Sequence, residues 1–184
     1  MPCVPVVGNE IINRDFVEKY KDRLEAAYAL FDAGSQRIFE GCLEFMLGGD
    51  LETLKAVTTE KDEVFKNILK LTPDEHYLDL GAYRGDTVDE LLRYSGGTYG
   101  SIIAVEPDRR TFKKLCEHVD GMPDVVPVQK AIYSFSGTAN FNSAAGRQSA
   151  IGENGSQIET VTVDELCDGR EITYIKMDVE GAEI

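Results

Sequence analysis

The stretch Asp79-Leu80-Gly81-Ala82-Tyr83-Arg84-Gly85-Asp86-Thr87 carries the pattern of a strand, a glycine turn and a helix in direct succession. An apolar run over 76–80 leads into the turn, and apolar residues recur at helical spacing over 87–94. In a doubly wound sheet such a junction is where ligands bind, because strand ends and helix N-termini converge there. Gly81 and Gly85 allow the backbone to turn tightly and to approach a ligand without a Cβ in the way.

The spacing of the two glycines narrows the class of ligand. It is GxxxG, so the three-glycine dinucleotide fingerprint is absent, and no GxxxxGK[ST] phosphate loop occurs in the chain. Asp79 stands two residues before Gly81, where a carboxylate favours a cationic ligand over a pyrophosphate. Taken alone, a strand followed by GxxxG is more often a plain turn than a ligand site.

Around this junction, short predicted strands alternate with helices along the chain. We expect strands over 76–80, 101–105, 125–128 and 172–177, with helices over 87–94 and 108–119. This alternation predicts an α/β fold with a parallel sheet in the strand order 3-2-1-4, covered by helices. Residues 138–141 and 158–163 alternate apolar and polar side chains, which predicts an antiparallel insertion joined by a loop over 142–156.

The first part of the chain has a helical period instead. We expect helices over 15–32, 36–47, 50–57 and 62–71, with Ser35 as the N-cap of the second and Asp50 as the N-cap of the third. The predicted domains are therefore a helical segment over 1–72 and a ligand-binding domain over 73–184. The helical segment is interpreted as a cap on its neighbour, although amphipathic stripes of this kind more often serve ordinary core packing.

The composition excludes several classes of function. The 184 residues include 19 Lys and Arg against 33 Asp and Glu, and this net charge of −14 disfavours nucleic acids and anionic membranes as partners. No apolar run reaches the ~20 residues of a membrane span, and the N-terminal residues lack the pattern of a secretory signal. Four scattered Cys and two His disfavour disulfides and zinc. We expect a cytoplasmic protein without a bound metal.

Carboxylates follow two further strands of the predicted sheet. Glu106-Pro107 comes directly after 101–105, and an acid at that point can accept hydrogen bonds from the two hydroxyls of a ribose. Asp178 and Glu180 follow 172–177, and Asp178 falls opposite Gly81 if this strand pairs with the first. Acids at helix starts are also common without any ligand, and a group of carboxylates is compatible with a hard cation such as Mg²⁺.

These motifs, in this order, resemble the FkbM family of S-adenosylmethionine-dependent methyltransferases. LDLGAYRGDT looks like the first motif of the family, IIAVEPD like its second, and IKMDVEGAE like its fourth-strand motif. KAIYSFSGTANF and VTVDEL look like its linking segments, so the resemblance covers about 73–184. The segment DAGSQRIFEGCLEFMLGGD is similar to a leader found in one bacterial branch of the family.

The resemblance implies a Rossmann-like fold and O-methylation of a hydroxyl on a sugar or other secondary metabolite, with S-adenosylmethionine as the cofactor. Glu106 would bind its ribose, and Asp178 would face its methionine amino group or the transferred methyl. Glu180 is the candidate for accepting the hydroxyl proton. The residues that would line the rest of the cofactor are Asp79, Gly81, Ala82, Gly85, Asp86, Thr87, Pro107, Ala131 and Ile132.

The chain differs from the family pattern at its end. The family continues through a helix and three more strands, whereas this sequence stops at Ile184, so we expect a truncated form. We also expect self-association through an exposed fourth strand. A non-catalytic module that binds S-adenosylmethionine or a protein partner remains an alternative. A nucleotide-linked oxidoreductase is disfavoured by the missing third glycine and by Asp79.

Overall fold

The computed structural model describes residues 12–142, 150–151 and 156–179, and the chain forms two compact units, Met1–Val64 and Phe65–Ile184. The division lies earlier than the predicted boundary at 72/73. Residues 65–71 group with the second unit because Phe65 stacks on Tyr94, with ring centroids 4.4 Å apart, and Leu71 packs on that unit's core.

The first unit is helical, as predicted, but its helix boundaries differ. The structure has α1 (Arg14–Lys19), α2 (Lys21–Tyr28), α3 (Ala33–Gly48), α4 (Leu51–Ala56) and α5 (Lys61–Glu63). The π-helix η1 (Val64–Leu69) follows and begins at the last residue of this unit.

Two of the helix predictions for this unit are wrong. The single helix expected over 15–32 is broken at Tyr20, whose backbone leaves the helical region at φ −109°, ψ 15°. Ser35 is not a cap, because Asp32 accepts a hydrogen bond from the Ser35 amide at 2.7 Å and thereby starts α3 earlier. Gly49 ends α3 in the left-handed region, and Asp50 caps α4 as expected.

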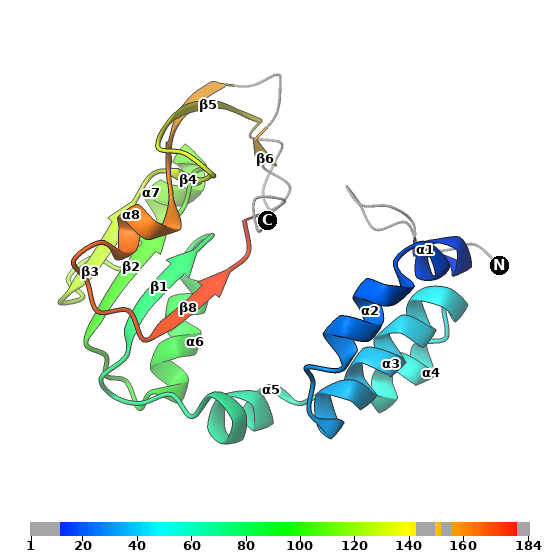
Figure 1. Cartoon of the computed structure of the whole chain (residues 1–184). Helices are drawn as coiled ribbons and strands as arrows, with labels where there is room; N and C mark the ends of the chain where they lie inside the picture. Colours follow the sequence, from blue (N-terminus) through cyan, green and yellow to red (C-terminus); the bar gives the residue numbers. More distant parts are fainter. Residues whose placement is uncertain (1–11, 143–149, 152–155, 180–184) are drawn as a thin grey trace. The chain divides into compact units, whose positions relative to one another are not determined.

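The second unit is built on a parallel sheet (Figure 1). Its strands are β1 (His76–Leu80), β2 (Ser101–Val105), β3 (Val125–Val128) and β8 (Tyr174–Met177), in the order β3-β2-β1-β8. All three pairings are parallel, which confirms the predicted α/β fold and strand order. The helices α6 (Asp86–Tyr94) and α7 (Arg109–His118) connect β1 to β2 and β2 to β3.

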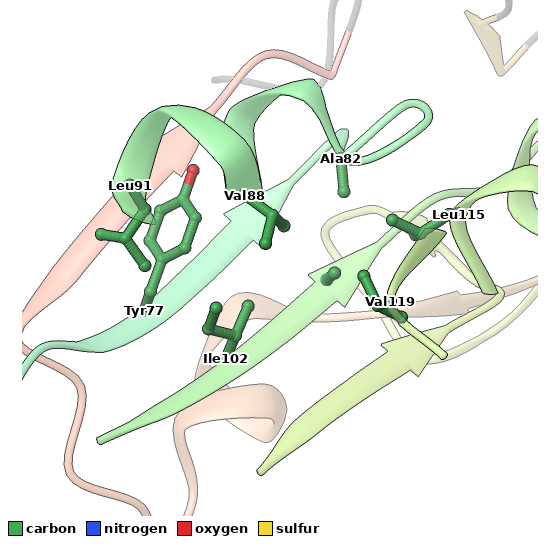
Figure 2. Packing of buried hydrophobic residues seen from close by; sticks show 8 residues of the cluster. Tyr77, Ala82, Val88, Leu91, Ile102, Leu115 and Val119 are labelled. Atoms are coloured by element: carbon green, nitrogen blue, oxygen red, sulfur yellow. The ribbon is translucent and has the colours of Figure 1, made fainter. Parts of the chain in front are cut away.

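Alternation along the strands divides the core between the two faces of this sheet. Tyr77 and Ile102 project from one face and pack with Val88 and Leu91 of α6 and Leu115 of α7 (Figure 2). The other face carries a second buried cluster: Leu78, Leu80, Ile103 and Val105 with Ile132, Val161 and Leu166. Because successive strand residues point to opposite faces, both faces are apolar and both are covered.

The insertion between β3 and β8 forms a second sheet. Its strands are β4 (Ala131–Ile132), β5 (Gly137–Asn142), β6 (Ala150–Ile151) and β7 (Ser156–Val161), in the order β4-β7-β5-β6. The antiparallel pairing of β5 with β7 confirms the expected insertion, whereas the parallel pairing of β4 with β7 was not predicted. The helix α8 (Val163–Cys167) follows and buries Leu166 in the core. Within the described residues, no helix has the length and apolar character of a bilayer span.

Candidate functional site

The glycine turn after β1 has an unusual backbone. Gly81, Tyr83 and Gly85 adopt positive φ angles of 83°, 49° and 96°, so three of five consecutive residues are left-handed. A tyrosine rarely adopts this conformation, and such strained residues persist only where surrounding contacts hold them. The amides of Gly81 and Ala82 both donate to the Val105 carbonyl at 2.9 Å, which fixes the turn to the end of β2.

The end of β8 lies against this turn, as its pairing with β1 predicted. The Asp178 amide donates to the Leu80 carbonyl at 3.0 Å. A Cβ on Gly81 would lie 2.1 Å from the Asp178 carbonyl oxygen, so a side chain at this position would clash with the backbone of the next strand. Gly81 is therefore required both for its φ angle and for this close approach.

Asp79 is completely buried beneath the first turn of α6. Its Oδ2 accepts a hydrogen bond from the Thr87 hydroxyl, and its Oδ1 has no hydrogen-bond partner among the described residues. The Lys176 ammonium lies 3.4 Å from Oδ1. At this distance the ammonium compensates the negative charge of the carboxylate without forming a well-directed hydrogen bond. Burial raises the pKa of Asp79, and the positive charge of Lys176 opposes the rise.

Lys176 belongs to this site, although the sequence interpretation did not include it. It stands opposite Asp79 in the register of β8 with β1, so both side chains share one face of the sheet. Its Nζ donates to the Gly81 carbonyl at 2.7 Å and lies 3.4 Å from the Leu80 carbonyl oxygen. The signal in the sequence was a single lysine inside an otherwise apolar strand, two residues before Asp178.

Glu106 occupies the tip of β2 and connects two loops. Its Oε2 accepts a hydrogen bond from the Tyr83 amide at 3.0 Å, and its Oε1 accepts one from the Asp108 amide at 2.8 Å. Burial raises the pKa of Glu106 to about 7, although both hydrogen bonds favour the ionised form. Each oxygen retains a second lone pair, so this carboxylate can still accept two hydrogen bonds from a ligand.

The other predicted site residues lie near the same sheet edge in different environments. Ala82 is fully buried in the core, Asp86 is exposed at the start of α6, and Pro107 is half-buried beside Glu106. Ala131 and Ile132 are buried in β4, three and four residues beyond the end of β3. Asp178 is exposed. Glu180 lies outside the described residues.

The groups at the carboxyl end of the parallel sheet can bind a small polar ligand. Among the described residues, no three His, Cys, Asp or Glu side chains are grouped as metal ligands. The carboxyl ends of β1, β2 and β8 present two acceptor sites on Glu106 that no described residue occupies and, after β8, the exposed carboxylate of Asp178. This combination suits a ligand that carries both hydroxyls and a positive charge.

Comparison with known proteins places this site in a family. The family model described as the methyltransferase FkbM domain matches residues 79–184, which begin at Asp79 and include the turn, Glu106 and the end of β8. The chain is 33% identical to the hexuronic acid methyltransferase AglP of Haloferax volcanii over 95 residues, which are 47% of this chain and 40% of that protein.

A solved structure has the same fold. The crystal structure of the methyltransferase FkbM from Methylobacillus flagellatus KT matches with a TM-score of 0.74 at 18% identity, over 92% of this chain and 44% of that chain. This chain thus spans less than half the length of either protein. The family match covers more than half of the sequence and contains the whole described site, and the chain belongs to the family of FkbM methyltransferase domains.

Proposed function

We propose that the protein is an S-adenosylmethionine-dependent methyltransferase that acts on a hydroxyl of a sugar. The observation that carries the proposal is Glu106, a buried carboxylate with two unused lone pairs at the tip of β2, beside a strained glycine turn. The sugar acceptor is supported by the similarity to AglP, a hexuronic acid methyltransferase.

The residues present fit this cofactor. The vicinal hydroxyls of a ribose match the two remaining acceptor sites of Glu106. The methionine end carries an ammonium, for which the exposed carboxylate of Asp178, directly after β8, is the candidate partner. Gly81 and Gly85 line the turn, with Asp86 and Thr87 at the adjoining helix start. Pro107, Ala131 and Ile132 are the candidates for its apolar contacts, whereas the side chain of Ala82 packs in the core behind the turn.

When bound, S-adenosylmethionine supplies an activated methyl group on a sulfonium to a nucleophilic oxygen. This chain's contribution is to hold the two reactants in line, which is worth up to ~7–11 kcal/mol in well-oriented systems. Asp178, exposed beside Gly81, is proposed to position the cofactor's methionine end. Glu180 is proposed to accept the proton of the sugar hydroxyl.

Calorimetric titration with S-adenosylhomocysteine at pH 6 and pH 8 tests the binding proposal. Because ribose hydroxyls donate to an ionised Glu106 whose pKa is raised to about 7, affinity should rise by about 10-fold between these pH values. Glu106→Gln should bind at least ~10-fold more weakly at pH 8, with no such pH dependence.

The matched control is Glu75→Gln. Glu75 is also a buried carboxylate, but it lies before β1, at the opposite end of the strand from the turn, and accepts hydrogen bonds from Thr72 and Thr173. Its substitution should leave affinity and its pH dependence unchanged. If Glu106→Gln binds as tightly as the parent, the ribose assignment is wrong. Methyl transfer to hexuronic acids and to neutral sugars then tests the acceptor, and binding without transfer would favour a non-catalytic module.

A further inference from the structure

The ammonium of Lys176 is surrounded by acceptors that belong to a different strand. Its Nζ lies 2.7 Å from the Gly81 carbonyl oxygen, 3.4 Å from that of Leu80 and 3.4 Å from Oδ1 of Asp79. These three acceptors belong to consecutive residues, two at the end of β1 and one at the start of the glycine turn. An ammonium has three donors, so this one is matched in number by its surroundings.

Two different roles are consistent with these contacts. In the first, Lys176 merely compensates the buried charge of Asp79, whose Oδ1 has no other partner among the described residues. In the second, its shortest contact matters most: the bond to the Gly81 carbonyl restrains the first residue of a turn that is left-handed at Gly81, Tyr83 and Gly85. A strained turn of this kind needs such restraints to remain in one conformation.

The hydrogen-bond geometry favours the second role. The bond to the Gly81 carbonyl is short, whereas the contact with Asp79 lies at the long end of the range. The restrained carbonyl lies one strand away from Glu106, whose Oε2 holds the Tyr83 amide of the same turn. Lys176 and Glu106 therefore fix the turn from its two sides, one through a carbonyl and the other through an amide.

We propose that Lys176 is a positioning residue, which holds the Gly81 carbonyl so that the glycine turn is preorganised for the methionine end of the cofactor. This inference rests on the proposed function for its ligand. It goes beyond that function in assigning a binding role to a residue that is not expected to touch the transferred methyl group. The restraint on the turn exists without any ligand, so it can be measured without one.

The test compares Lys176→Met with the double variant Asp79→Asn/Lys176→Met. The single variant leaves the buried Asp79 charge uncompensated and is expected to be less stable. The double variant has no buried charge to compensate, and it should recover much of that stability while the Gly81 carbonyl stays unrestrained. Lys113→Met, which removes an exposed ion pair with Glu117 on α7, is the control for the substitution itself.

Two readouts separate the roles. In the unliganded protein, amide hydrogen exchange at Gly81, Ala82 and Tyr83 should be about 10-fold faster in the double variant than in the parent. Affinity for S-adenosylhomocysteine should remain at least ~10-fold weaker in the double variant, and Lys113→Met should match the parent in both measurements.

Either of two results would overturn the inference. The first is a double variant that regains parental affinity and exchange rates together with stability, which would make Lys176 only a charge partner. The second is exchange at the turn that does not change in any Lys176 variant. If the parent protein itself does not bind S-adenosylhomocysteine, the proposed function fails instead, and the exchange measurement still decides whether Lys176 restrains the turn.

Discussion

At the scale of single residues, the structure requires glycine at position 81 for two reasons, the left-handed φ angle and the close approach to β8. Substitutions can separate these two effects. Alanine at this position would keep a φ of 83° and would place a Cβ 2.1 Å from the Asp178 carbonyl oxygen. Gly81→Ala should lower the free energy of unfolding by roughly 2–5 kcal/mol, the sum of left-handed strain and overpacking. Chemical denaturation measures this loss.

Gly97 provides the matched control for this substitution. It has the same φ of 83°, but no atom lies within 4 Å of its Cβ position. Gly97→Ala should therefore cost only the strain, about 1–2 kcal/mol, and should leave ligand binding intact. Equal losses for the two variants would show that the contact between the turn and β8 is looser than described.

Most of the residues at the carboxyl end of the sheet could be identified from the sequence, but the contacts between them could not. Asp79, Gly81, Glu106 and Asp178 were recognisable because their positions follow from strand ends and glycine spacing, which are local features. That Lys176 reaches the Gly81 carbonyl depends on the register of β8 with β1, and the two strands are separated by more than 90 residues of sequence. No local pattern encodes such a register.

At the scale of elements, the helix α6 begins directly after the glycine turn and is held on the sheet by its buried face. Leu91 is 1% exposed and belongs to the core, whereas its neighbour Leu92 is only partly buried at the edge of that core. Leu91→Ala should lower the free energy of unfolding by about 2–5 kcal/mol, because a cavity remains beneath the helix. Leu92→Ala has the same effect on helix propensity and should cost clearly less. Equal losses in denaturation experiments would contradict this packing.

The strands of the parallel sheet were more predictable than the helices of the first unit. Each parallel strand is a short apolar run, and β1, β2 and β8 end in a turn or a carboxylate, so their positions are clear from composition. The interruption at Tyr20 leaves the apolar spacing almost unchanged, so periodicity did not reveal it. The parallel pairing of β4 with β7 joins two segments across an insertion, and alternation within either segment does not specify a partner.

At the scale of the whole molecule, the two units differ in how they bury their side chains. All the fully buried apolar side chains of the described residues lie in the second unit, whereas Leu30, Phe31 and Leu51 of the first unit are exposed. Regions with few buried contacts open more readily. In hydrogen-exchange mass spectrometry, β1 and β2 should exchange most slowly, and α2 and α4 much faster. Protection of α2 equal to that of β1 would contradict this difference.

We propose that S-adenosylmethionine binds at the carboxyl ends of β1, β2 and β8. The most direct test is an amide NMR titration of this chain with S-adenosylhomocysteine at pH 8. The largest shift changes are expected at Gly81–Thr87 and Glu106–Asp108, with smaller changes at Ala131 and Ile132 and little change at the other end of the sheet, around Glu75 and Gly100. Saturable shifts confined to other segments, or no shifts at millimolar ligand, would contradict it.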